Sequence, residues 1–126
     1  MRVRKRALAT IVGLLMVAGG TTLVTAPTAS ATNCKGSWSP TANGEGKALM
    51  NANRNLKLGP YGDCTNALTV DHVVFWLWCY YDNTVGNEWW YGRVNGINTM
   101  GWFSADDLQI QGYDDNGDGY VEYQAC

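Results

Sequence analysis

The plainest chemical pattern in the chain is an acidic segment near its end, DDNGDGYVE, at positions 114–122. Oxygen-bearing side chains occupy its first, third and fifth positions, as in a calcium loop of the EF-hand type: Asp114, Asn116 and Asp118. Gly119 stands at the sixth position, where such loops require glycine. The twelfth position should supply a bidentate carboxylate, but Ala125 stands there. We therefore interpret the segment as a polar turn, predict no metal or other cofactor, and keep weak calcium binding as the alternative.

Residues for nucleophilic or acid–base catalysis are scarce. His72 is the only histidine, and no serine lies in a G-x-S-x-G setting. Carboxylates that could form a catalytic pair for glycoside cleavage are present: Asp63, Asp82, Glu88, Asp106 and Asp107. Because no second base stands near His72 in the sequence, and charged residues in loops are usually solvated, we predict that the protein is not an enzyme.

The cysteines point to an oxidising compartment. There are four of them after the first 31 residues: Cys34, Cys64, Cys79 and Cys126. An even number in a small exported chain is typical of disulfide bonds, which would leave no thiol nucleophile. No C-x-x-C pair exists, so a zinc site with sulfur ligands is not expected. Three pairings are possible; we favour Cys64–Cys79, which closes a short loop, and Cys34–Cys126, which joins the two ends.

The first 31 residues have the pattern of a secretory signal peptide. Basic residues precede an uncharged, mostly apolar run at 7–26, and Ala29–Ala31 has the small-x-small form of a cleavage site. An uncleaved membrane anchor is the alternative. Cleavage leaves 95 of the 126 residues, with five basic and eleven acidic side chains. We expect a secreted or wall-associated monomer that is free of the membrane after cleavage, and the acidic balance argues against nucleic acid as a partner.

Strand patterns dominate the rest of the chain. The strongest is the aromatic and β-branched run VVFWLWCYY at 73–81. Further strands are expected at 48–58, 89–94 and 101–103, and Asn95–Gly96 is a typical hairpin turn between the last two. No amphipathic helix is evident. Short strands separated by turn residues predict an all-β fold, a small barrel.

The strand at 73–81 has two apolar faces. Period-two alternation places one set of side chains on the expected core face: Val73, Phe75, Leu77, Cys79 and Tyr81. The other set is expected to be at least partly exposed: Val74, Trp76, Trp78 and Tyr80. Exposed aromatic residues in a row are typical of a binding surface. The alternative is that the disulfide-tied N-terminal arm covers them.

A family resemblance rests on several short motifs. The segment NLKLGP at 55–60 resembles the Asn-Val-Arg-Ser-Gly-Pro stretch of bacterial SH3 (SH3b) domains. The Trp-Trp pair at 89–90, the Asn95–Gly96 hairpin, the motif at 101–103 and the closing Leu108 are similar to the second half of that family. The likeness is to small secreted SH3 domain-containing proteins of actinobacteria.

The resemblance implies a particular domain organisation. An SH3-like barrel at 48–108 would be tied by disulfides to an irregular N-terminal arm at 32–47 and a C-terminal extension at 109–126 that carries the acidic turn. Two residues depart from the family pattern, Leu58 in place of serine and Gly92 in the middle of a strand. Glycine inside a strand indicates a bulge or the close approach of a neighbouring backbone or ligand.

The resemblance also implies a non-catalytic binding function. Its expected ligands are peptidoglycan peptides of the cell wall or other extended peptides, bound in an aromatic groove. The predicted ligand surface comprises Tyr61, Trp78, Tyr80, Asp82, Glu88, Trp89 and Tyr91. Trp89 and Tyr91 share a strand face with Arg93, whose charge favours solvent, whereas Trp90 should face the core. One alternative is a secreted inhibitor or toxin acting on a protein partner, and another is a small wall hydrolase built on the carboxylates named above.

Overall fold

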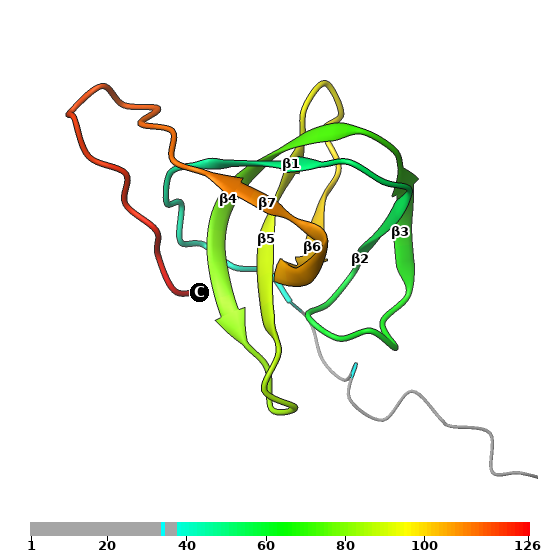
Figure 1. Ribbon diagram of the computed structural model, residues 1–126. Coiled ribbons are helices and arrows are strands. Elements are labelled where there is room, and N and C mark those ends of the chain that lie inside the picture. The colour runs from blue at the N-terminus through cyan, green and yellow to red at the C-terminus, as the bar shows by residue number, and fades with distance from the viewer. Residues whose placement is uncertain (1–33, 35–37) are drawn as a thin grey trace, which may run out of the picture.

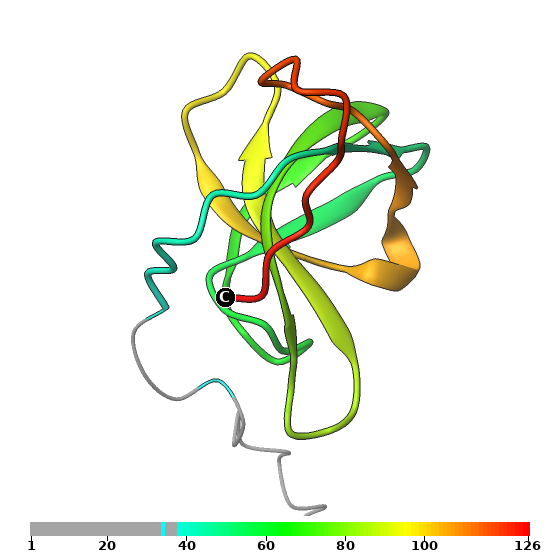
Figure 2. The same ribbon diagram turned by 90° about the vertical axis from the view of Figure 1, so that its left-hand side faces the viewer.

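The computed structural model describes Cys34 and residues 38–126, seen from two sides in Figures 1 and 2. These residues form seven strands and one 3-10 helix: β1 (Lys47–Met50), β2 (Arg54–Lys57), β3 (Asn66–Val70), β4 (Val73–Asp82), β5 (Glu88–Val94), β6 (Met100–Ser104), η1 (Ala105–Asp107) and β7 (Gln109–Gln111). None of the described residues forms a helix of the length and apolar character that a membrane crossing requires. The predicted signal peptide at 1–31 lies outside the described residues.

All seven strands belong to one antiparallel sheet, in the order β3-β2-β6-β5-β4-β1-β7. The sheet curls around its core without closing, and β3 and β7 are its two edges (Figure 1). The prediction of an all-β fold is confirmed. The single strand predicted at 48–58 is wrong, because β1 and β2 lie apart in the sheet and the chain turns between them. β7, in the predicted C-terminal extension, pairs with β1.

One face of the curled sheet forms the hydrophobic core. Its buried members come from six of the seven strands: Ala48, Met50, Leu56, Val70, Phe75, Leu77, Trp90, Val94 and Phe103. Phe75 on β4 and Phe103 on β6 meet edge to face, with ring centroids 4.9 Å apart, which is a favourable aromatic geometry. Trp90 is only 4% exposed, so its predicted place in the core is confirmed.

A bulge in β4 changes the face on which its side chains lie. The pairing with β5 shifts register between Leu77 and Cys79, which leaves one residue of β4 without an opposite partner. Beyond the shift, Tyr80 stands opposite Trp90 and packs against the core, with ring centroids 5.4 Å apart. Tyr81 points to the opposite face, as its aromatic contacts there show. The predicted faces of Tyr80, Cys79 and Tyr81 are therefore wrong, because strict alternation fails at an inserted residue.

A second aromatic cluster covers the opposite face of the sheet. Its rings are linked by contacts between 5.1 and 6.3 Å and belong to Trp38, Tyr61, Tyr81, Tyr91 and Trp102. Trp38 belongs to the N-terminal arm, and its ring centroid lies 5.3 Å from that of Tyr81 and 6.0 Å from that of Trp102. The arm thus covers part of the face that the sequence left open between a binding surface and a covered one.

The disulfide pairing differs from the prediction. All four cysteines are bonded, but the bridges are Cys34–Cys64 and Cys79–Cys126, with Cα–Cα distances of 5.0 and 5.1 Å. The bulge turns Cys79 away from the core face, and the C-terminal segment returns alongside it: the Cys126 N–H donates to the Tyr80 carbonyl at 2.9 Å. Sequence proximity favoured Cys64–Cys79, but the tertiary path of the last residues brings Cys126 to Cys79 instead.

The pairing can be checked by chemistry alone. Peptide mapping of the unreduced protein should recover one cross-linked peptide containing Cys34 and Cys64 and another containing Cys79 and Cys126. Thiol titration of the denatured, unreduced protein should find no free thiol. Recovery of a peptide that joins Cys64 to Cys79 would contradict the structure.

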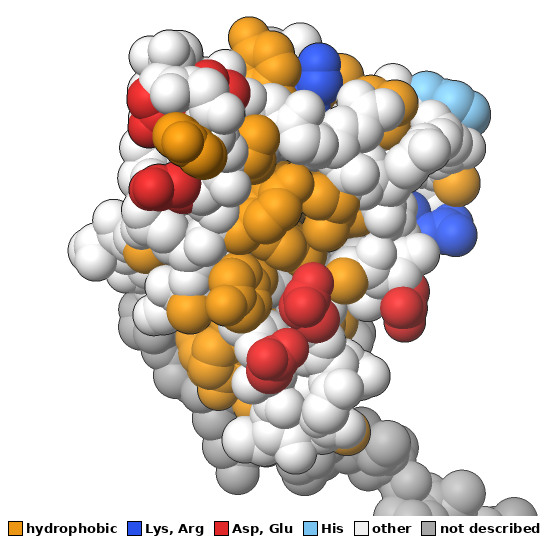
Figure 3. Space-filling view, turned by 60° about the vertical axis from the view of Figure 1, so that its left-hand side comes forward, with side chains coloured by type: hydrophobic (Ala, Val, Ile, Leu, Met, Phe, Trp, Pro, Cys, Tyr) orange, Lys and Arg blue, Asp and Glu red, His pale blue; other side chains and the backbone are white. Residues whose placement is uncertain are grey.

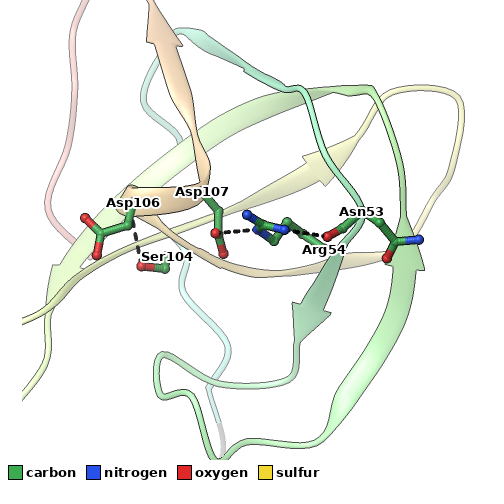
Figure 4. A network of polar contacts seen from close by, with 5 residues as sticks. All are labelled: Asn53, Arg54, Ser104, Asp106 and Asp107. Atoms are coloured by element: carbon green, nitrogen blue, oxygen red, sulfur yellow. Dashed lines mark hydrogen bonds and ion pairs between the residues drawn. The ribbon is translucent and has the colours of Figure 1, made fainter.

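A polar network joins β2 to the turn before β7 (Figure 4). Arg54 Nε donates to Oδ1 of Asp107 at 2.7 Å, and its Nη1 donates to the Asn53 carbonyl at 2.8 Å. Ser104 caps η1 by accepting a hydrogen bond from the Asp106 N–H at 3.4 Å. The Arg54 and Asp107 side chains are 46% and 30% exposed, so this pair contributes to the position of the turn more than to stability.

Candidate functional site

A groove lies where β4 and β5 meet the two terminal segments. It has a volume of about 500 Å³ and is lined by Asn43, Gly46, Trp76, Leu77, Trp78, Arg93, Tyr113 and Asp115. β4 contributes two indole rings from the face opposite the core, and β5 contributes Arg93 beside them, opposite Trp76 in the strand pairing. The arm before β1 and the segment after β7 supply the remaining wall, so residues from four parts of the chain meet here.

Aromatic contacts fix the shape of the groove. The Trp76 and Tyr113 rings meet edge to face with centroids 5.4 Å apart, and Lys47 Nζ lies 4.7 Å from the centroid of Tyr113. Trp76 Nε1 donates to Asn95 Oδ1 at 3.1 Å, which holds the indole against the β5–β6 turn. Trp78 packs edge to face on Tyr91 at 6.2 Å. These side chains therefore present ring faces that are already ordered before a ligand arrives.

Charge is present at the groove in both signs. Arg93 is exposed and has no ion-pair partner within the described part of the chain. Asp115 supplies an exposed carboxylate on the opposite segment. In Figure 3 hydrophobic side chains form a continuous band down this side of the molecule, with acidic groups beside it. An apolar surface bordered by both charges suits a ligand that has apolar parts and ionised ends.

The predicted ligand residues do not form one surface. Trp78 lines the groove, and the ring of Tyr91 packs against Trp78 without lining the groove itself. Tyr80 is partly exposed but packs on the core face, so the face predicted for it is wrong. Trp89 is 6% exposed and Tyr61 is 5% exposed, so the prediction that they lie at the surface is also wrong.

The burial of Trp89 and Tyr61 has a common cause. Trp89 lies on the face that the sequence assigned to it, opposite Tyr81, but the second aromatic cluster occupies that end of the face. Tyr61 belongs to the cluster through Trp38, and its hydroxyl lies 3.2 Å from Thr84 Oγ1. The charge of Arg93 correctly predicted that this residue is exposed to solvent. At the other end of the same strand, however, the second aromatic cluster covers Trp89.

The predicted acidic residues lie at the end of the β4–β5 hairpin. Asp82 and Glu88 are exposed and stand opposite each other in the strand pairing. Glu88 Oε1 accepts a hydrogen bond from Trp90 Nε1 at 2.7 Å, so it satisfies a core indole. Neither residue lines the groove, whose acidic side chain is Asp115.

Sequence reasoning missed several groove residues. Trp76 was predicted to share the outer face with Trp78 but was left out of the predicted ligand surface. The alternation of the strand was enough to include it. Tyr113 and Asp115 gave no such signal, because their place depends on the return of the C-terminal segment across the sheet, which Figures 1 and 2 show. Asn43 likewise belongs to an arm without regular structure.

An acidic cluster adjoins the groove. Carboxylate oxygens of Glu45, Asp114 and Asp118 all lie within 4.8 Å of one another. Glu45 is 7% exposed, and burial together with the nearby aspartates raises the pKa of Glu45 above its ordinary value, although a backbone N–H opposes this. The backbone N–H groups of Gly119 and Gly117 donate to Asp114 and lower the pKa of its carboxyl.

The groove offers binding surfaces more than reactive groups. Its ionisable side chains are those of Arg93, Tyr113 and Asp115, and neither a histidine nor a free thiol is among its lining residues. His72 is exposed in the turn between β3 and β4, where it contacts only its neighbour Asp71 among the ionisable groups of the described chain. Comparisons with family models, with curated proteins and with solved structures find no match to this chain.

Proposed function

We propose that this chain is a secreted, non-catalytic binding module with an SH3-like barrel, and that its groove holds an extended peptide, in the first place a peptidoglycan peptide of the cell wall. The observation that carries the proposal is the groove of about 500 Å³ lined by Trp76, Trp78 and Tyr113. Ordered aromatic rings bind a flexible chain well, because their own side chains lose little entropy on binding.

The charges of the groove support a ligand of this kind. Wall peptides carry free carboxylates and amines, and the groove presents Arg93 for the former and Asp115 for the latter. Arg93 is uncompensated by any acidic neighbour at ion-pair distance in the described residues, so it is available to a ligand. Apolar contact from the rings and polar contact at the borders would together orient an extended chain.

Three further features support the fold and the compartment in this proposal. β1 and β7 pair, so the first and last strands in chain order are neighbours in the sheet. η1 directly precedes Leu108, the closing residue in the resemblance to SH3b domains. Two disulfide bonds are compatible with an extracellular location.

A matched pair of tyrosine variants tests the groove. Tyr113→Ala should weaken binding to purified cell wall by about 10-fold or more, because it removes a ring from the ligand surface. Tyr120→Ala should leave binding unchanged, since Tyr120 is 74% exposed and does not line the groove. Co-sedimentation with purified wall measures the affinity, and circular dichroism checks that both variants fold.

The same assay separates the alternatives. If the wild-type protein does not bind purified wall but binds a protein from culture supernatant, the module is an inhibitor or toxin that acts on a protein partner. Release of soluble fragments from the wall would instead identify a hydrolase. Equal wall binding by Tyr113→Ala and Tyr120→Ala would contradict the groove as the site.

A further inference from the structure

We propose that Glu45, Asp114 and Asp118, together with Asn116, form a calcium-binding site. The segment 114–122 has the ligand spacing of a calcium loop but lacks its last carboxylate, since Ala125 stands at that position. The tertiary structure brings Glu45 to the loop from a segment far earlier in the chain. Glu45 thus takes the place of the missing ligand. Because Glu45 lies outside the loop, the sequence of the loop alone does not indicate it.

The distances fit a single ion. Calcium binds oxygen ligands at about 2.3–2.6 Å, so two oxygens on opposite sides of one ion are about 5 Å apart. The carboxylate oxygens of Glu45, Asp114 and Asp118 lie within 4.8 Å of one another. These separations match those of oxygens that share one calcium ion, and backbone carbonyls or water would complete the 6–8 oxygen ligands that calcium takes.

Glu45 provides an observation independent of the loop. Glu45 is 7% exposed, and no basic side chain within the described residues forms an ion pair with it. The Glu122 N–H donates to Glu45 Oε2 over a long distance, 3.4 Å. A buried carboxylate that faces two others needs a positive partner, and a cation at their centre supplies it.

The backbone holds Glu45 firmly in this position. The Glu45 N–H donates to the Glu122 carbonyl at 2.8 Å, and the Gly44 N–H donates to the Trp78 carbonyl at 2.6 Å. A Cβ at Gly44 would lie 2.8 Å from the Glu122 oxygen, so this close approach requires glycine. The arm and the C-terminal segment are thus packed together at the acidic cluster, and the Cys79–Cys126 bridge fastens the far end of the segment.

Calcium in this site would also fix a wall of the groove. Tyr113 and Asp115 flank the ligand Asp114 in the chain, and both line the groove. An ion that holds Asp114 therefore holds its neighbours in the positions that the groove uses. This consequence goes beyond the proposed peptide binding, and the site can be tested without any peptide.

The test uses the disulfide-intact mature protein, stripped with EDTA and titrated with calcium chloride at constant ionic strength. We expect a saturable rise in melting temperature with a midpoint of about 0.1–1 mM, the range of extracellular calcium modules, because an ion that binds only the folded state stabilises it. Isothermal titration calorimetry should give about one site per chain. The absence of a saturable response, or an equal response to magnesium, would overturn the proposal.

Two glutamate variants separate a site from general charge screening. Glu45→Gln should abolish the calcium response and, in EDTA, raise the melting temperature, because it removes an uncompensated buried charge. Glu122→Gln makes the same chemical change on an exposed side chain outside the cluster and should keep the wild-type response. Asp118→Asn should also abolish the response. Equal calcium responses in Glu45→Gln and Glu122→Gln would overturn the assignment of Glu45.

Discussion

Replacement of Gly92 by alanine is expected to destabilise the domain by about 3 kcal/mol or more, at the upper end of what overpacking a core costs. Gly92 lies in β5 between Leu77 of β4 and Gly101 of β6. A Cβ at this position would overlap the backbone carbonyl oxygen of Trp76 and would lie 2.9 Å from the ring of Phe75. Phe75 is fully buried, and the Trp76 carbonyl belongs to the β4–β5 pairing, so neither can move freely.

Urea unfolding of Gly92→Ala against a matched glycine variant measures this effect. Gly62 has no atom within 4 Å of the position of an added Cβ and no positive φ, so Gly62→Ala should change the free energy of unfolding by less than about 0.5 kcal/mol. A Gly92→Ala protein that unfolds at the wild-type urea concentration would show that the strands can separate to admit a methyl group. The sequence expectation of a close backbone approach at Gly92 is confirmed by this geometry.

Trp102→Ala is expected to cost about 3–5 kcal/mol, as large core truncations do, although Trp102 lies on the face opposite the main core. Trp102 is 1% exposed. Its ring centroid lies 5.1, 6.0 and 6.3 Å from those of Tyr91, Trp38 and Tyr81. Loss of the indole would open a cavity at the centre of the second aromatic cluster. The N-terminal arm would lose the surface on which Trp38 packs.

Two companion variants sharpen this test. Trp76→Ala makes the same substitution at a half-buried groove position and should cost clearly less in urea unfolding. Trp102→Phe should cost less than Trp102→Ala, because it keeps a ring and removes an indole N–H that is buried without an acceptor in the described structure. If Trp102→Ala and Trp76→Ala lowered the free energy of unfolding by equally small amounts, the second cluster would be a loose surface layer and not part of the folded interior.

Local patterns determined the central strands of this protein and one of its turns. The β-branched and aromatic run at 73–81 forms β4, within one residue of its predicted end. Asn95–Gly96 forms the predicted turn between β5 and β6, with Gly96 at φ +78°, where glycine carries no steric penalty. Trp90 lies in the core as predicted. These features depend on residues close together in the sequence, so the sequence alone determines them.

The composition of the candidate site depended on contacts between distant segments. The bulge between Leu77 and Cys79 reversed the faces of the residues from Cys79 onward, and alternation in the sequence contains no mark of an inserted residue. The C-terminal segment returns across β4 and brings Cys126 to Cys79. The same return brings Asp114 to Glu45. Such pairings follow from the path of the whole chain, because packing and loop closure are decided over tens of residues, so only the tertiary structure could reveal the groove and the complete acidic cluster.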